Sequence, residues 1–118
     1  MGSTGFESEL KEFVKQADGY VSQKYLTRVK DRFQYLEQRC YVQAKNNEYK
    51  FADCMVDVTK KLMDEERTMV YKHHFLEQNL YECFARGSGK PDLLSKCKSY
   101  TIEMIDKSYE NFFKNVNQ

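Results

Sequence analysis

Proline and glycine are scarce in this chain, whose 118 residues include one proline and five glycines. These two residues interrupt regular structure most often, so their scarcity favours long helices joined by few turns. Apolar residues still make up 41% of the chain, which is enough for a packed core. A disordered chain would have fewer apolar residues and more net charge, so we expect a folded protein.

An excess of one charge sign and long apolar runs are also missing. The 19 Lys and Arg residues nearly balance 18 Asp and Glu residues, which leaves a net charge of +1. This balance excludes the strongly basic surface typical of proteins that bind nucleic acid or anionic lipid. Charged residues interrupt every apolar stretch before the roughly 20 residues that cross a bilayer. We therefore expect no transmembrane segment and at most a peripheral membrane contact.

The N-terminal segment does not have the composition of a targeting sequence. A secretory signal needs an apolar core, and a mitochondrial presequence is poor in acidic residues. We expect neither here, because the first 20 residues have no apolar segment and contain four acids, namely Glu7, Glu9, Glu12 and Asp18.

The sequence carries no motif for a reaction or a cofactor. No Ser–His arrangement or nucleotide motif is present, and segment 87–90 (GSGK) lacks the preceding strand of a phosphate-binding loop. His73 and His74 are neighbours that point about 100° apart on a helix, so they do not chelate one metal ion together. We therefore expect no enzymatic activity, no catalytic residues, no cofactor and no metal site.

Apolar residues recur at steps of three and four along three segments. That period is typical of amphipathic helices, and no segment alternates for long as a strand would. The chain is predicted to be all-α, a single domain over residues 1–118 with elongated antiparallel hairpins of about three long helices. A break near Gly19 or Asp64 would split these into four or five. The expected helices cover residues 6–45, 48–86 and 91–115.

Two turns separate the predicted helices. Segment 86–92 (RGSGKPD) combines a glycine helix end with a proline that fits the first turn of the next helix. Asn46 and Asn47 tolerate the left-handed backbone found at helix ends. Both connections are short, so the helices on either side of each turn are expected to run antiparallel.

The four cysteines form two equally spaced pairs, each fourteen positions apart. Fourteen positions along one helix cover about 21 Å, far beyond the roughly 4.4–6.8 Å between Cα atoms of a disulfide. The midpoint of each pair falls in a predicted turn, however, and residues equidistant from a turn face each other in a hairpin. We therefore expect one disulfide per hairpin, Cys40–Cys54 and Cys83–Cys97.

Two other arrangements of the cysteines stay open. A nested pairing, Cys40–Cys97 with Cys54–Cys83, is also symmetric but requires the chain to reverse near Thr68, where no turn residue occurs. Alternatively, all four thiols are reduced, because each lies on an apolar stripe and buried cysteine behaves as a small hydrophobic residue. A zinc site is disfavoured, since structural zinc ligands come at intervals of about two to five residues.

Helical hairpins stapled by cysteine pairs resemble small proteins of the mitochondrial intermembrane space. Cys40 and Cys54 resemble the inner cysteines of a small Tim chaperone hairpin, with Leu36 and Val58 at the outer positions. Coiled-coil-helix-coiled-coil-helix proteins are a more distant resemblance, since they carry two cysteines in each helix.

Over most of its length, the chain most resembles the mitochondrial family called family with sequence similarity one-three-six. That family has a helical arm, a stapled hairpin, a long helix and a second stapled hairpin, with Cys-x-x-x-Cys motifs. Here Cys40 and Cys54 match the inner pair of the first hairpin, and Cys83 and Cys97 the outer pair of the second. The resemblance implies the intermembrane space and oxidation by its disulfide relay, but no reaction.

Aromatic residues are abundant, with nine Tyr and eight Phe. Several fall outside the main apolar stripes, which fits either a thick aromatic core or a second apolar face for a protein partner. In the second interpretation, residues 6–33 and 100–116 are docking arms. The predicted contact positions are Tyr35, Tyr41, Tyr71, His74, Tyr109 and Phe112.

These features predict a structural accessory subunit or scaffold, docked on a larger respiratory-chain or ATP-synthase complex from the intermembrane-space side. Its partners are expected to be proteins and not nucleic acid. Two alternatives remain. One is a small-Tim-like chaperone that shields apolar segments of membrane proteins, and the other is a cytosolic or cytoskeletal helical binding protein with reduced cysteines.

Overall fold

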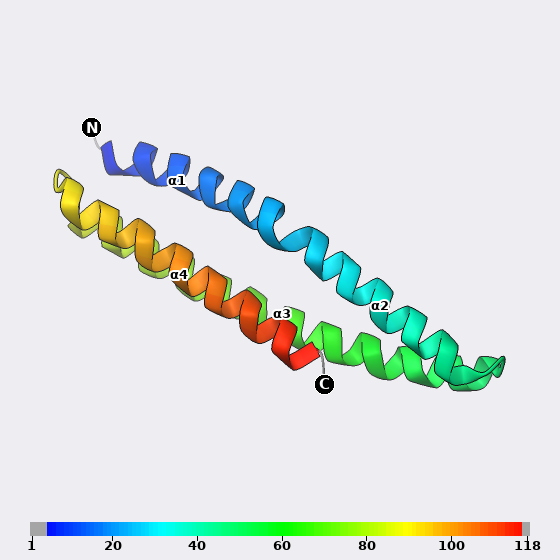
Figure 1. Ribbon diagram of the computed structural model, residues 1–118. Coiled ribbons are helices and arrows are strands. Elements are labelled where there is room, and N and C mark those ends of the chain that lie inside the picture. Colours follow the sequence, from blue (N-terminus) through cyan, green and yellow to red (C-terminus); the bar gives the residue numbers. More distant parts are fainter. Residues whose placement is uncertain (1–4, 117–118) are drawn as a thin grey trace.

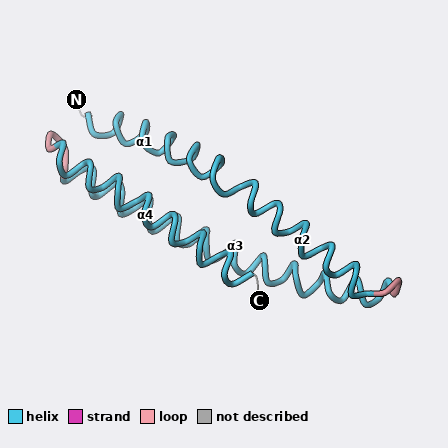
Figure 2. Tube along the Cα trace, in the orientation of Figure 1, coloured by secondary structure: helices cyan, strands magenta, loops and turns pink. Residues whose placement is uncertain are grey.

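A computed structural model describes residues 5–116, and every regular element in that range is helical. Figure 2 shows helix along nearly the whole trace, with loops at the two turns. The all-α prediction is therefore confirmed. The elements are α1 (Gly5–Val21), the π-helical segment η1 (Ser22–Leu26), α2 (Thr27–Ala44), α3 (Glu48–Arg86) and α4 (Pro91–Val116).

Three long antiparallel rods make up the molecule. α1, η1 and α2 form one rod, called the first rod below, which is followed by α3 and then α4 (Figure 1). The shape is elongated, with extents of 65 × 21 × 20 Å. The backbone stays helical across Gly19 and Asp64, so neither residue splits a helix. The one irregularity within a rod is the π-helical segment, which the sequence did not predict.

Local chemistry explains both turns. Lys45 and Asn46 adopt left-handed backbone (φ 51° and 67°) after α2. Asn47 then caps α3, because its side-chain oxygen accepts hydrogen bonds from the backbone N–H of Tyr49 and Lys50 at 3.0 and 3.2 Å. In the second turn Gly89 has φ 77°, a conformation that glycine adopts without steric cost. Both predicted turns are thus present.

A disulfide closes each hairpin. The Cα atoms of Cys40 and Cys54 are 5.6 Å apart, and those of Cys83 and Cys97 are 6.0 Å apart. Each bridge lies about two helical turns from its loop. The predicted adjacent pairing is confirmed, and the structure has neither the nested pairing nor the reduced cysteines considered above. The two bridges fix the level at which α2 meets α3 and α3 meets α4.

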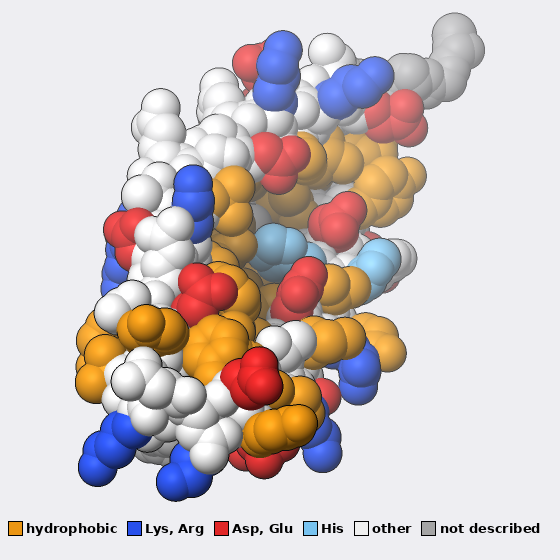
Figure 3. Space-filling view, turned by 90° about the vertical axis from the view of Figure 1, so that its right-hand side faces the viewer, with side chains coloured by type: hydrophobic (Ala, Val, Ile, Leu, Met, Phe, Trp, Pro, Cys, Tyr) orange, Lys and Arg blue, Asp and Glu red, His pale blue; other side chains and the backbone are white. Residues whose placement is uncertain are grey.

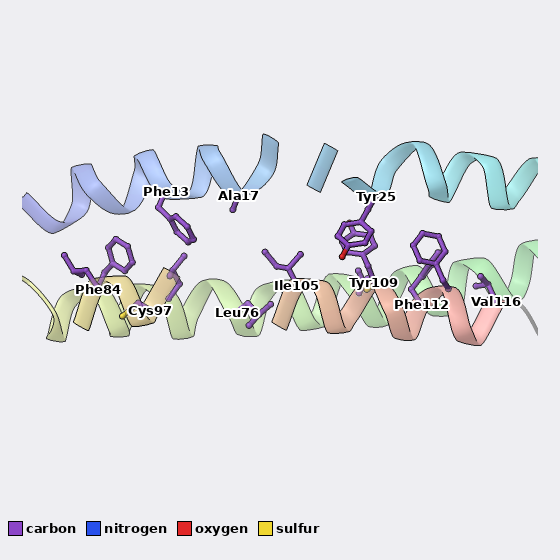
Figure 4. Close-up of a cluster of buried hydrophobic side chains, with 14 residues drawn as sticks. Phe13, Ala17, Tyr25, Leu76, Phe84, Cys97, Ile105, Tyr109, Phe112 and Val116 are labelled. Atoms are coloured by element: carbon purple, nitrogen blue, oxygen red, sulfur yellow. The ribbon is translucent and has the colours of Figure 1, made fainter. Parts of the chain in front are cut away.

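The core lies where the first rod rests on α3 and α4. Phe13 stacks against the fully buried Phe84, with ring centroids 6.1 Å apart. Tyr25 is 1% exposed and stacks on Tyr109 with centroids 4.3 Å apart. Figure 4 shows Phe13 and Tyr25 pointing from the first rod toward the other two helices. Truncating a core aromatic to alanine typically costs about 3–5 kcal/mol, so these contacts anchor the first rod.

The end of the molecule near the first turn has two helices instead of three. α4 ends beside Glu65, whose Oε2 accepts a hydrogen bond from Nδ2 of Asn115 at 3.2 Å. The α3 residues before that level lie beside α2, as Figure 1 shows at the right-hand end, and of α4 only the C-terminal part reaches them, where Val116 lines a hollow with Leu62. Residues equidistant from Asn47 face each other across the hairpin, so the two-helix section covers residues 31–63. Each of its helices is about 24 Å long. We call this section the tip hairpin.

Removal of the Cys40–Cys54 bridge is expected to loosen the tip hairpin selectively, because α4 supports it only at the end away from the turn. For the C40S/C54S variant we expect a loss of amide hydrogen-exchange protection concentrated in residues 31–63. The free energy of unfolding should fall by about 3 kcal/mol, the chain-entropy value for a loop of this size.

The matched control is the C83S/C97S variant, which removes an equally spaced bridge from the three-helix section. Its protection loss should fall near the second turn and leave residues 31–63 protected. A uniform loss over all three rods in the C40S/C54S variant would contradict the independence of the tip hairpin.

Candidate functional site

A polar cluster lies at the middle of the bundle, where the π-helical segment interrupts the first rod. Tyr20 and Tyr25 both donate hydroxyl hydrogen bonds to Oδ1 of Asp106 on α4, the Tyr20 bond being 2.6 Å long. Residues five apart on an α-helix point about 140° away from each other. A π-turn bonds residues five apart and so brings them to the same side. The irregular turn therefore lets two tyrosines reach one carboxylate.

Lys24 completes this cluster. Its Nζ lies 2.9 Å from the Tyr20 hydroxyl and 3.4 Å from Oδ1 of Asp106. The ammonium also lies over the rings of Tyr20 and Tyr25, at 5.3 and 5.4 Å from their centroids. Lys24 is about half exposed, so water screens much of its attraction to the carboxylate.

The surroundings of Asp106, Tyr25 and Tyr109 shift the pKa values of these three residues away from neutral pH. Burial opposes ionisation of Asp106, but the two tyrosine hydroxyls and Lys24 outweigh it and lower the pKa of Asp106. Burial and the hydrogen bond to Asp106 raise the pKa of Tyr25 to about 12. Burial likewise raises the pKa of Tyr109. The carboxylate of Asp106 is thus charged and the phenols of Tyr25 and Tyr109 are neutral at physiological pH, an arrangement suited to joining two helices.

The predicted contact positions divide into exposed and buried residues. Tyr35, Tyr41 and Tyr71 are exposed, with exposed fractions of 54%, 62% and 68%, and His74 is exposed as well. The solvent contact required for partner binding is present at these four positions, and their role in binding stays a prediction.

Tyr109 and Phe112 are not exposed contact positions, and that part of the prediction is wrong. They are 8% and 7% exposed and belong to the core. Tyr109 lies under the ring of Tyr25, and Phe112 makes an edge contact with Phe113 at 5.5 Å. The face of α4 that carries them is covered by the first rod.

The predicted contact positions leave out a set of exposed apolar side chains. Several of them recur at seven-residue intervals, which is a signal readable from the sequence. The set comprises Leu26, Phe33, Val42, Tyr49, Val56, Met63, Val70, Phe75, Tyr81 and Tyr100.

Residues 5–116 contain neither a metal-binding cluster nor a membrane-spanning helix. Within that range, no group of three or more His, Cys, Asp or Glu side chains is placed to hold a metal ion. None of the helices there has both the length and the apolar content needed to cross a membrane.

Comparisons with known proteins add no relative. No family model, characterised protein or solved structure matches this chain. The disulfides, the polar cluster and the exposed apolar side chains are therefore the basis for assigning a function.

Replacing Asp106 is expected to destabilise the protein in a pH-dependent way. Because the folded-state pKa of Asp106 is lowered, its carboxylate contributes stability above the unfolded value near 3.9, and this contribution is lost as the pH falls through the folded-state pKa. At pH 7, D106N should lose about 1.5–3 kcal/mol of unfolding free energy, the usual contribution of hydrogen bonds to a charged group. Denaturant unfolding at pH 7 and at pH 3 measures both effects.

The control is E110Q, which neutralises an exposed carboxylate on the same helix. It should unfold like the wild type at pH 7. The difference between wild type and D106N should shrink toward pH 3. An equal difference at both pH values would mean that Asp106 stabilises the bundle without its charge.

Proposed function

We propose that this protein is a non-enzymatic structural accessory subunit or scaffold that docks on a larger mitochondrial complex from the intermembrane-space side. The respiratory-chain and ATP-synthase complexes are the partners we favour. The observation that carries this proposal is the tip hairpin, a disulfide-closed pair of helices that presents aromatic and aliphatic side chains to solvent.

The cysteines support the proposed compartment. Disulfides form and persist in oxidising environments and are rare where glutathione keeps thiols reduced. Both bridges join helices across a short turn, the arrangement that resembles intermembrane-space hairpin proteins. The resemblance described above selects this compartment among the oxidising ones.

The surface of the tip hairpin supports docking. Tyr41 and Val42 are each 62% exposed, and Tyr49 is 77% exposed on the opposite side of the turn. Tyrosine is enriched at protein interfaces because it combines a large apolar ring with a hydroxyl. Exposed apolar clusters on a soluble protein mark interaction sites. The ring of Tyr41 also packs edge-on against Phe51 at 6.3 Å, which holds it in place.

The geometry of the tip hairpin favours a binding element over a catalytic one. The Cys40–Cys54 bridge and the Asn47 cap hold the two helices and their turn in one arrangement. A surface fixed before binding loses less conformational entropy when a partner docks. The hairpin also projects beyond the end of α4, so it can enter a recess of a larger assembly (Figure 1).

Substitution of the two tip tyrosines is expected to release the protein from its complex. We predict that the wild-type chain in a mitochondrial extract migrates with a respiratory-chain or ATP-synthase complex on native electrophoresis. The Y41A/Y49A variant should migrate as free protein, because it loses two exposed aromatic side chains. Exposed substitutions usually change stability by less than about 0.5 kcal/mol, so the variant should remain folded.

The matched control is Y100A, which removes an exposed tyrosine from α4, away from the tip hairpin. It should stay with the complex. A wild-type chain that migrates free would contradict docking. An assembly of about six copies of the purified chain in light scattering would instead favour the small-Tim-like chaperone.

A further inference from the structure

Two hollows lie between the first rod and α3. The first has a volume of about 250 Å³ and is lined by Val14, Val21 and Leu80, among others. The second has a volume of about 570 Å³ and is lined mainly by apolar residues, including Leu26 and Met63. Both therefore follow the same helix–helix boundary, one on each side of the π-helical segment.

The two hollows open on the same side of the molecule. Residues of α4 line both, namely Thr101 and Ile105 in the first and Tyr109 and Phe112 in the second. These are buried residues, so α4 forms the floor and the opening faces away from it. Figure 3 shows hydrophobic side chains around a hollow on one side of the molecule, with carboxylates among them. We call the two hollows together the groove.

Both walls of the groove carry exposed apolar side chains, and those of the first rod are seven residues apart. On the first rod these are Leu26 and Phe33, which are 50% and 38% exposed. On α3 the exposed apolar residue that lines the groove is Met63, which is 54% exposed, and Val56 and Val70 stand seven positions before and after it along the helix. A seven-residue apolar repeat is the pattern with which one helix packs alongside another. The walls are thus patterned for a helix that lies parallel to them.

The length of the groove also suits a helix. Its lining residues on the first rod run from Val14 to Phe33, which corresponds to about 30 Å of helix. A helix of about 20 residues spans that distance. Placed there, it would be opposite α4 and would complete a four-helix bundle, whose core is formed by inward-facing apolar positions on each helix.

Charge along the groove specifies the polar flanks of such a helix. The charged lining residues are the acids Asp18, Glu66 and Glu77 and the single base Lys30. Within the described part of the chain, the ion pairs shorter than 4.0 Å involve none of these acids. His73, which lines the first hollow, has a buried Nε2 without a hydrogen-bond partner among the described residues. The groove therefore offers unpaired negative charge and one polar atom to a ligand.

From the paired walls, the length and the acidic lining, we infer that the groove binds an amphipathic helix of a partner protein whose apolar heptad face is flanked by Lys and Arg. An anionic lipid fits less well, because the lining acids would repel its headgroups. This inference goes beyond the scaffold role, since the groove needs neither the tip tyrosines nor a mitochondrial location.

The test uses the oxidised full chain and two labelled synthetic peptides of about 20 residues. Both carry leucine at the first and fourth positions of each heptad. One has lysine at the flanking positions, and the other has glutamate there. In fluorescence anisotropy we expect the lysine peptide to bind at least about tenfold more tightly than the glutamate peptide. The methyl NMR signals of Leu26 and Met63, which line the groove, should shift on binding, and that of Val42 on the tip hairpin should not.

Two groove variants and one control complete the design. L26Q/M63Q makes the walls polar at exposed positions and should weaken lysine-peptide binding at least about tenfold. D18N/E66Q/E77Q should remove most of the preference for lysine over glutamate flanks. Y41A/Y49A should bind both peptides like the wild type, so that failure of the tip-hairpin proposal remains distinguishable from failure of this one.

Three outcomes would overturn the inference. Equal binding of the two peptides would mean unspecific apolar capture. Binding of phosphatidylserine-containing vesicles in place of either peptide would assign the groove to lipid. Self-association of the free chain that L26Q/M63Q abolishes would assign it to a second copy.

Discussion

The pairing of α3 with two different neighbours is the constraint on which this structure depends. α3 packs against α2 near its beginning and against α4 over the rest, and one disulfide fixes the level of each pairing. Because α3 has 39 residues and α4 has 26, the bundle has three helices at one end and two at the other. The tip hairpin exists because of that difference in length.

The polar cluster serves a different purpose from the disulfides. Neither bridge involves α1 or η1, so that part of the first rod is held by the aromatic core and by Asp106. The π-helical segment directs Tyr20 and Tyr25 toward this carboxylate. On its other side, facing away from α4, the first rod leaves the groove against α3 open. The contact between the first rod and α4 therefore determines both which side chains form the core and which apolar side chains of the groove walls stay exposed.

Much of this fold could be predicted from local patterns. The stripes of apolar residues indicated the helices, and the cysteine spacings about Asn47 and the second turn indicated the bridges. The π-helical segment could not be predicted, since Asp106 lies more than eighty positions from Tyr25. Burial of Tyr109 and Phe112 depends on the same long-range docking. The groove could not be predicted without knowing which helices face each other, although the seven-residue spacing of Leu26 and Phe33 was readable in the sequence.

The most direct test of a hairpin scaffold from an oxidising compartment is disulfide mapping on the native protein. The protein would be isolated from its own cells without reductant, free thiols would be alkylated at once, and the peptides would be identified by mass spectrometry. We predict Cys40–Cys54 and Cys83–Cys97 bridges with no alkylated cysteine. Four alkylated cysteines would contradict the proposed compartment, and bridges Cys40–Cys97 and Cys54–Cys83 would contradict the arrangement of the helices.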